Sequence, residues 1–287
     1  MKREGGARLS LLSSMIIFGT IGIVRRFIPL PSGLVAFSRG AIGMLFLCAV
    51  ILIRRERLDR KTIRAHLPVL LLSGALIGAN WILLFESYRY TTVATATLCY
   101  YMAPLFVMLV SPCLLRERLG ARQIVCMAVA FVGMILVSGV TESGFSGIGE
   151  LRGILFGLGA AVLYATVVLL NQRLKSVEAF PKTAIQLGAA AFAVLPYSLL
   201  AERVTEPQTW YVIPLLLLVG ILHTGVSYVL YFGSMKHLKA HTVALFSYID
   251  PIVAILLSLI VLHEPMTPLA AVGAVLILGS TVFGELS

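Results

Sequence analysis

The sequence predicts an all-α membrane protein with ten transmembrane helices, arranged as two inverted repeats of five helices each. Three observations carry this prediction: long apolar runs, one internal repeat, and the placement of lysine and arginine. Of the 287 residues, 59% are hydrophobic and only 13% are charged, whereas a soluble domain carries about 25% charged residues. Runs of about 20 apolar residues, which are long enough to cross roughly 30 Å of hydrocarbon, recur along the chain.

The internal repeat is clearest in two segments that align without a gap. Residues 95–117 read TATLCYYMAPLFVMLVSPCLLRE, and residues 242–264 read TVALFSYIDPIVAILLSLIVLHE. The alignment pairs Tyr101 with Tyr248, Pro104 with Pro251, and Glu117 with Glu264. Shared Tyr, Pro and Glu at one constant offset make a chance match between two Leu-rich segments improbable. The chain is therefore a duplicated membrane protein, with residues 1–140 as the first repeat and 141–287 as the second.

The apolar runs define the elements in order. The ten predicted spans are 9–29, 34–53, 67–88, 93–115, 121–140, 151–171, 182–200, 211–234, 242–262 and 268–285. The first follows a basic start but lacks a small-residue cleavage site, so we interpret it as a retained helix. Short links favour antiparallel neighbours in one integral membrane bundle. Thr267 and Pro268 form an N-cap and first-turn pair that opens the last helix.

Lysine and arginine alternate between the two predicted sides of the membrane. With the N-terminus inside, most of the 23 basic residues are cytoplasmic, and Arg39 alone lies within a span. Because each repeat has five spans, an odd number, the second repeat must be inverted. The loop RERLGAR at 116–122 becomes HEPMTPL at 263–269, without lysine or arginine. This loss of basic residues from the outer copy is typical of inverted repeats.

Composition and motifs argue against several function classes. The net charge of +10 sits in short loops that orient helices, so it does not indicate nucleic-acid binding. The four cysteines lie in or beside apolar spans without disulfide or metal-ligand spacing. No nucleotide-binding loop or catalytic triad is evident. We expect no enzyme activity, no cofactor and no metal.

The paired segments LLRERLGARQ and VLHEPMTPLA are each followed by a Gly-containing apolar helix. Over nearly its whole length, the chain with these segments resembles the EamA-like family of the drug/metabolite transporter (DMT) superfamily. The family tends to carry an Arg early in its second span, and SRG at 38–40 fits; the second half has Gln186 near the comparable place. The resemblance implies carrier function and a central cavity surrounded by the first four helices of each half.

Asp250 is the sharpest candidate for a functional residue. It lies one residue before Pro251 inside a span, and its repeat partner is Ala103. An ionised carboxylate there costs about 3 kcal/mol or more, so it should face a cavity or a partner. We interpret it as a proton-coupling group or a counter-charge for a substrate ammonium. The alternative is a structural ion pair or a group that satisfies the helix break.

Arg39 is the natural partner for Asp250. Its guanidinium could instead hold a substrate carboxylate through two parallel hydrogen bonds. The structural alternative is that the side chain reaches outward to the membrane interface.

Aromatic and polar residues inside the spans complete the candidate site. A Tyr side chain offers a flat apolar face and a hydroxyl, which suits a cavity for amphipathic solutes. The alternatives are helix packing for the aromatics and interhelical hydrogen bonds for polar residues such as His223, Thr224 and Ser227. The predicted substrate-binding residues are Arg39, Asn80, Trp81, Tyr101, Gln186, Tyr228, Tyr248 and Asp250.

The favoured function is a secondary transporter of a small polar or amphipathic metabolite, such as an amino acid or a drug, that works by alternating access. The alternative is an intramembrane enzyme or receptor without transport. A channel is disfavoured, because no ring of like charges is visible. We expect a small-molecule substrate, the lipid bilayer and no nucleic acid as partners, with a homodimer as an open alternative. The predicted location is the bacterial inner (cytoplasmic) membrane, with both termini cytoplasmic.

Cysteine labelling checks this topology. A membrane-impermeant thiol reagent should label Arg57→Cys and Arg118→Cys only from the cytoplasmic side, and Pro265→Cys only from the outside. Labelling of position 265 from the cytoplasm would contradict the inverted repeat.

Overall fold

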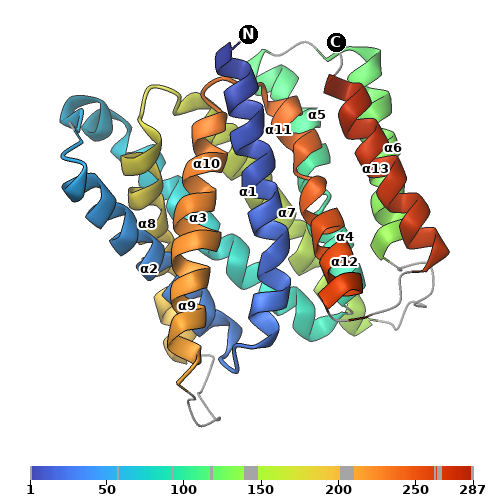
Figure 1. Cartoon of the computed structure of the whole chain (residues 1–287), viewed down its shortest axis with the longest axis horizontal. Coiled ribbons are helices and arrows are strands. Elements are labelled where there is room, and N and C mark those ends of the chain that lie inside the picture. Colours follow the sequence, from blue (N-terminus) through green and yellow to red (C-terminus); the bar gives the residue numbers. More distant parts are fainter. Residues whose placement is uncertain are drawn as a thin grey trace. The chain divides into compact units, whose positions relative to one another are not determined.

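The computed structural model describes residues 2–56, 58–91, 93–116, 119–138, 148–200, 210–261, 263 and 267–285. Every regular element in these ranges is a helix (Figure 1). Arg57, Glu117, Arg118, Glu264 and Pro265, on which the loop predictions depend, lie outside them.

The helices follow the predicted spans closely. They are α1 (Lys2–Arg26), α2 (Ser32–Ile53), α3 (Arg60–Tyr90), α4 (Val93–Tyr100), α5 (Ala103–Leu115), α6 (Ala121–Ser138), α7 (Ile148–Arg173), α8 (Ala179–Leu200), α9 (Val212–Gly220), the π-helix η2 (Ile221–Val226), α10 (Ser227–Ser234), α11 (Ala240–Phe246), α12 (Ile249–Val261) and α13 (Pro268–Glu285). Within the described residues, eight helical stretches are long and apolar enough to cross a membrane. Two more, Ala121–Leu136 and Pro268–Phe283, are apolar but shorter. The chain is an integral membrane protein.

The two repeat segments are both interrupted at the same place. α4 and α5 are separated by Tyr101 and Met102, and α11 and α12 are separated by Ser247 and Tyr248. The paired prolines, Pro104 and Pro251, lie in the first turn of the second helix of each pair. Proline is tolerated there because the N–H groups of a first turn have no intrahelical acceptor. The paired prolines therefore mark helix ends.

α3 begins earlier than the predicted span at 67–88. Asp59 caps it, because its Oδ1 accepts a hydrogen bond from the Thr62 backbone N–H at 3.1 Å and its Oδ2 accepts one from the Thr62 hydroxyl at 2.5 Å. These bonds hold the pKa of the Asp59 carboxyl below its usual value. The cap adds a polar helical turn before the apolar run. A span predicted from hydropathy does not include this polar turn.

The described helices group into two compact units. Unit 1 comprises Met1–Ile82 and Leu170–Leu238, and unit 2 comprises Leu83–Leu169 and Lys239–Ser287. Each unit takes helices from both sequence repeats, and α3 and α7 contribute to both units. The repeat boundary at residue 140 is a different division and stays a prediction.

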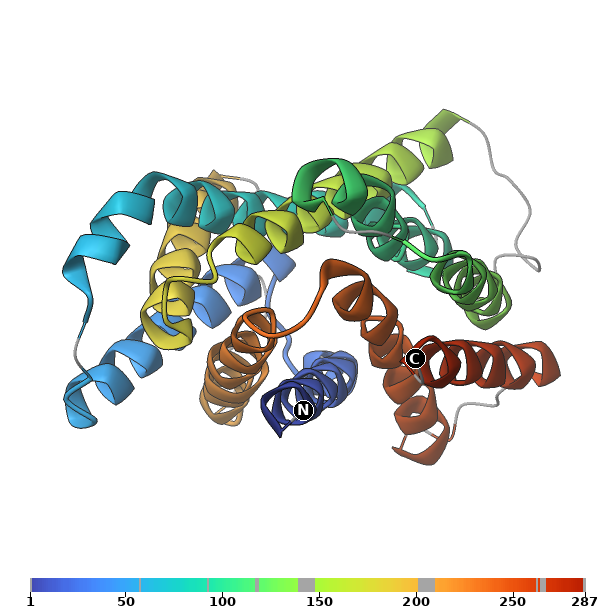
Figure 2. The same ribbon diagram turned by 90° about the horizontal axis from the view of Figure 1, so that it is seen from above.

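Glycines bring the helices of unit 1 close together, with α2 packed along α8 and against α9 and η2 (Figure 2). A Cβ added to Gly40 would lie 3.2 Å from Ala191 Cβ, and one added to Gly43 would lie 3.1 Å from the Gly220 carbonyl oxygen. Lipid tails are as apolar as leucine, so helices in membranes associate largely through such close packing of small residues.

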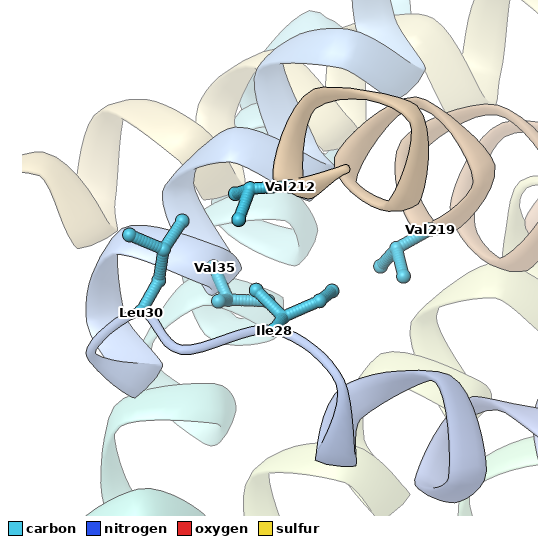
Figure 3. Close-up of a cluster of buried hydrophobic side chains, with 5 residues drawn as sticks. All are labelled: Ile28, Leu30, Val35, Val212 and Val219. Atoms are coloured by element: carbon cyan, nitrogen blue, oxygen red, sulfur yellow. The ribbon is translucent and has the colours of Figure 1, made fainter. Parts of the chain in front are cut away.

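A buried apolar cluster in unit 1 lies between the α1–α2 link, α2 and α9. Figure 3 shows Ile28 and Leu30 from the α1–α2 link and Val35 of α2 near Val212 and Val219 of α9. The link is fixed by Arg25, whose guanidinium donates to the carbonyls of Ile28 at 2.6 Å and Leu30 at 2.8 Å. Arg25 thus satisfies backbone oxygens that have no helical donor.

In unit 2, α6 and α13 lie side by side (Figures 1 and 2). A Cβ on Gly133 would lie 2.7 Å from the Gly273 carbonyl oxygen, so this pair also depends on glycine. The predicted cap of the last helix is confirmed: Thr267 accepts from the Ala270 N–H at 3.2 Å. Arg89 pairs with Glu86 at 2.9 Å.

The close approach of α3 to α8 in unit 1 can be tested by adding one methyl group to a glycine. A Cβ on Gly78 would lie 2.6 Å from the Ala190 carbonyl oxygen, a backbone atom that cannot move away alone. Gly78→Ala should therefore destabilise the protein by about 1–3 kcal/mol, measured as a lower midpoint of thermal unfolding in detergent. Gly22→Ala is the control, because its Cβ meets nothing within 4 Å. Equal midpoints for the two variants would contradict the packing.

Candidate functional site

The candidate site in unit 1 is built around the guanidinium of Arg39. Arg39 Nε donates to Thr224 Oγ1 at 3.0 Å, which joins α2 to η2. Arg39 Cζ lies 4.6 Å from the centre of the Trp81 ring of α3. A cation over an aromatic face is attracted by the ring quadrupole, more strongly where water is excluded. Two helices besides its own therefore fix the plane of this guanidinium.

The π-helix η2 sets the position of Thr224. Thr224 Oγ1 donates to the Val219 carbonyl at 2.9 Å, and Ser227 Oγ donates to the Leu222 carbonyl at 3.0 Å. Both acceptors lie five residues back, whereas Ser and Thr in an α-helix bond carbonyls three or four residues back. The wider turn re-aims its side chains, and such turns occur frequently at functional sites.

Aromatic side chains adjoin Arg39. The rings of Trp81 and Tyr228 are 6.4 Å apart at 71°, and those of Tyr228 and Phe18 are 5.2 Å apart at 73°. Edge-to-face contacts of this kind hold ring orientations. Trp81 and Tyr228 are both buried. The structure thus brings together Arg39, Trp81 and Tyr228, and adds Phe18, Thr20, His223 and Thr224.

Gln186 belongs to a separate polar group in unit 1. Its Nε2 donates to Ser73 Oγ at 2.8 Å and to Asn171 Oδ1 at 3.2 Å, so it joins α8 to α3 and α7. Among the described residues, no hydrogen bond reaches its Oε1, although the side chain is fully buried. Asn80 is also buried, next to Trp81 in α3.

Lys182, the first residue of the predicted span 182–200, lies in the first turn of α8 and is only 2% exposed. Its Nζ donates to the Phe232 carbonyl at 3.2 Å and lies 5.9 Å from the Phe232 ring. The only sequence signal for this burial is the four-residue spacing to Gln186, which puts both on one helix face.

The remaining predicted residues meet in unit 2. Tyr248 Oη donates to the Tyr101 carbonyl at 3.2 Å, and the two rings are 6.4 Å apart. The repeat partners therefore touch, each at its own helix break. The Tyr101 side chain hydrogen-bonds Asp250, the second residue of α12. Since Arg39 belongs to unit 1 and Asp250 to unit 2, their predicted pairing stays a prediction.

A surface groove of about 520 Å³ lies elsewhere in unit 1. Residues from the start of α1 and the end of α10 line it, including Ala7, Ser10, Ser234 and Lys236. None of its lining residues belongs to the Arg39 group, so the groove does not define that site.

Comparisons with known proteins also indicate a transporter. The model of the EamA-like transporter family matches twice, at residues 7–139 and 151–283. An uncharacterized transporter of Bacillus subtilis, YxxF, is 29% identical over 259 residues, which cover 89% of this chain and 82% of that protein. The biotin transporter of Escherichia coli is 25% identical over 249 residues, covering 83% and 79%. A crystal structure at 20% identity superposes with a TM-score of 0.84 over 98% of both chains, which concerns the fold alone.

The contact of Arg39 with Trp81 gives an optical test. The chain has two tryptophans, and Trp210 is 84% exposed. In a Trp210→Phe background, Thr224→Val should free the guanidinium and shift the Trp81 emission, because the cation over the ring moves. Thr166→Val, at an exposed Thr bonded only to its own helix, is the control. An emission spectrum unchanged by Thr224→Val would show that Thr224 does not position Arg39.

Proposed function

Because the chain belongs to the EamA-like transporter family, we propose that it is a secondary transporter of a small amphipathic carboxylate, working by alternating access. The observation that carries the substrate class is the Arg39 guanidinium, held between Thr224 and the face of Trp81 beside Tyr228. A guanidinium matches a carboxylate through two parallel hydrogen bonds. The adjoining rings suit the apolar body of such a solute.

The relatives favour the same class. Both curated relatives are named as transporters, which favours transport over an intramembrane enzyme or receptor. One is named as a biotin transporter, and biotin combines a carboxylate with an apolar chain and ring. Biotin is therefore the first probe for this chain, followed by aromatic amino acids, which combine the same two features.

The architecture that we propose has ten spans in two inverted repeats, with both termini cytoplasmic. Two observations support it: the family model matches each half, and helix breaks recur at Tyr101 and Tyr248. In carriers of this kind, one bundle rocks against another around a fixed site near the midplane. Units 1 and 2 are each compact and draw on both repeats.

Asp250 has a proposed role of its own in unit 2. Its carboxylate, hydrogen-bonded by Tyr101, is our candidate for coupling transport to protons. Its repeat partner is Ala103, so the duplicated fold does not require an acid at this place. Tyr101, Tyr248 and Asp250 are the proposed substrate-contacting residues of unit 2, and Asn80 and Gln186 are further proposed ones in unit 1.

Uptake into proteoliposomes tests the function. Labelled biotin should accumulate in wild-type vesicles, and more so with a proton gradient directed inward. Arg39→Gln should reduce uptake about tenfold or more, because it removes a charged bidentate contact. Arg54→Gln removes the same charge at the far end of α2 and should leave uptake unchanged.

Asp250→Asn separates coupling from binding in the same assay. Loss of gradient-driven uptake with surviving biotin exchange supports the coupling role, and a wild-type rate and pH profile would refute it. If neither biotin nor any amphipathic carboxylate is transported, the proposed substrate class is wrong.

A further inference from the structure

His223 lies in η2, directly before Thr224, and takes no part in the proposed carboxylate contact. The side chain is 1% exposed, although it is a titratable group inside a predicted span. Its Nε2 lies 2.7 Å from Thr20 Oγ1 of α1, and its Nδ1 lies 3.3 Å from the Leu218 carbonyl oxygen. Both ring nitrogens therefore have a partner.

The hydrogens available on Thr20 and the Leu218 carbonyl show that these partners can hydrogen-bond His223 in both its neutral and its protonated state. A carbonyl only accepts, so Nδ1 carries a hydrogen toward Leu218. The Thr20 hydroxyl has one hydrogen, and its Oγ1 also lies 2.7 Å from the Ile17 carbonyl oxygen. If that hydrogen goes to Ile17, Nε2 must donate to Thr20, and the ring is an imidazolium. If the hydroxyl turns toward Nε2, the ring is neutral.

Rotation of one hydroxyl thus satisfies His223 with or without its second proton, and no heavy atom has to move. A buried group whose partners serve only one state would resist titration, since the other state leaves a polar atom unpaired. The partners of His223 serve both protonation states. Its ring can therefore gain and lose a proton without leaving a polar atom unpaired.

The charges around His223 come from the helices packed on η2, which are α1, α2, α9 and α10. α2 contributes Arg39, which acts electrostatically on His223. α1 carries its charged residues at its ends: Lys2, Arg3, Glu4, Arg8, Arg25 and Arg26. α9 and α10 carry none. A proton on His223 is therefore repelled mainly by Arg39, unless an anion offsets the guanidinium charge.

We propose that His223 is the site where a proton binds together with the carboxylate substrate at Arg39. This inference rests on the proposed function and assigns the coupling proton to His223 in place of Asp250; the His223→Gln and Asp250→Asn variants distinguish the two sites. The carboxylate removes the repulsion that opposes the imidazolium, and by reciprocity the imidazolium strengthens carboxylate binding. One proton and one monocarboxylate add no net charge. The loaded carrier then avoids moving charge through the membrane potential, which costs about 2.3 kcal/mol per charge at 100 mV.

The charge coupling is measured without any substrate. In the full chain labelled with 15N-histidine in nanodiscs, ring nitrogen shifts report the protonation of each of the five histidines. His223→Gln identifies the His223 signal. At one pH within its titration, Arg39→Gln should raise the protonated fraction relative to the neutral one by about threefold or more, equivalent to half a pKa unit. Arg54→Gln is the matched control and should leave the ratio unchanged.

A second variant keeps the test valid if His223→Gln fails to fold. Thr20→Val removes the partner of Nε2 in both states; because the bond donated by the charged ring is the stronger one, the protonated fraction of His223 should fall at the same pH. A ratio identical in wild-type, Arg39→Gln and Thr20→Val protein would overturn the proposal. A ring that stays neutral from pH 5 to pH 8 would also overturn it.

Biotin then tests the link to substrate. Saturating biotin should raise the protonated fraction of His223 in wild-type protein but not in Arg39→Gln. His223→Gln should exchange biotin across the membrane yet lose the stimulation of uptake by a proton gradient. If biotin is transported and His223→Gln keeps the wild-type pH profile, the His223 proposal fails while the proposed function stands. If biotin does not bind, the proposed substrate is wrong. The protonated fraction of His223 in wild-type protein and in Arg39→Gln then tests only the charge coupling between Arg39 and His223.

Discussion

The close approach of α2 to η2 and α8 is the contact on which the site in unit 1 depends. Gly43 faces the Gly220 carbonyl and the Thr224 methyl group with room for a hydrogen only. Arg39 lies one turn before Gly43 on α2, so the separation that glycine allows also sets the reach of its guanidinium to Thr224. A membrane offers little hydrophobic drive between helices. The small residues therefore both hold unit 1 together and place its charge.

The π-helix gives this contact its chemistry. A regular turn would bond Thr224 and Ser227 to carbonyls four residues back and direct their side chains elsewhere on the helix surface. In η2 the hydroxyls reach back five residues, and Thr224 can accept from Arg39 while donating to Val219. His223 shares the same turn and contacts α1 through Thr20. One irregular turn thus connects the guanidinium proposed to bind the carboxylate with the ring proposed to bind the proton.

The sequence predicts the scaffold better than it predicts the partners within the site. Repeated Tyr and Pro at one offset located both helix breaks, and the spacing of Trp81 and Tyr228 anticipated that they share a site. The contact of Arg39 with Thr224 was not predictable, because hydropathy periods assume 3.6 residues per turn and do not register a π-turn. The burial of Lys182 was also not predictable from the sequence. Charge counting treats each basic residue near a span end as solvated, yet this one is covered by α10.

The distribution of chemical groups between the repeats shows how a duplicated scaffold acquires a function. Gly78, Tyr101 and Pro104 recur at the same offset as Gly225, Tyr248 and Pro251, where they set helix approach and helix ends. Three ionisable groups proposed for the site do not recur: Arg39 meets Gln186, Asp250 meets Ala103, and His223 meets Leu76. Even the backbone differs, since Gly74–Ala79 stays α-helical where its partner segment forms η2. Duplicated geometry allows two equivalent conformations, whereas a charge present in only one copy gives the two repeats different chemistry.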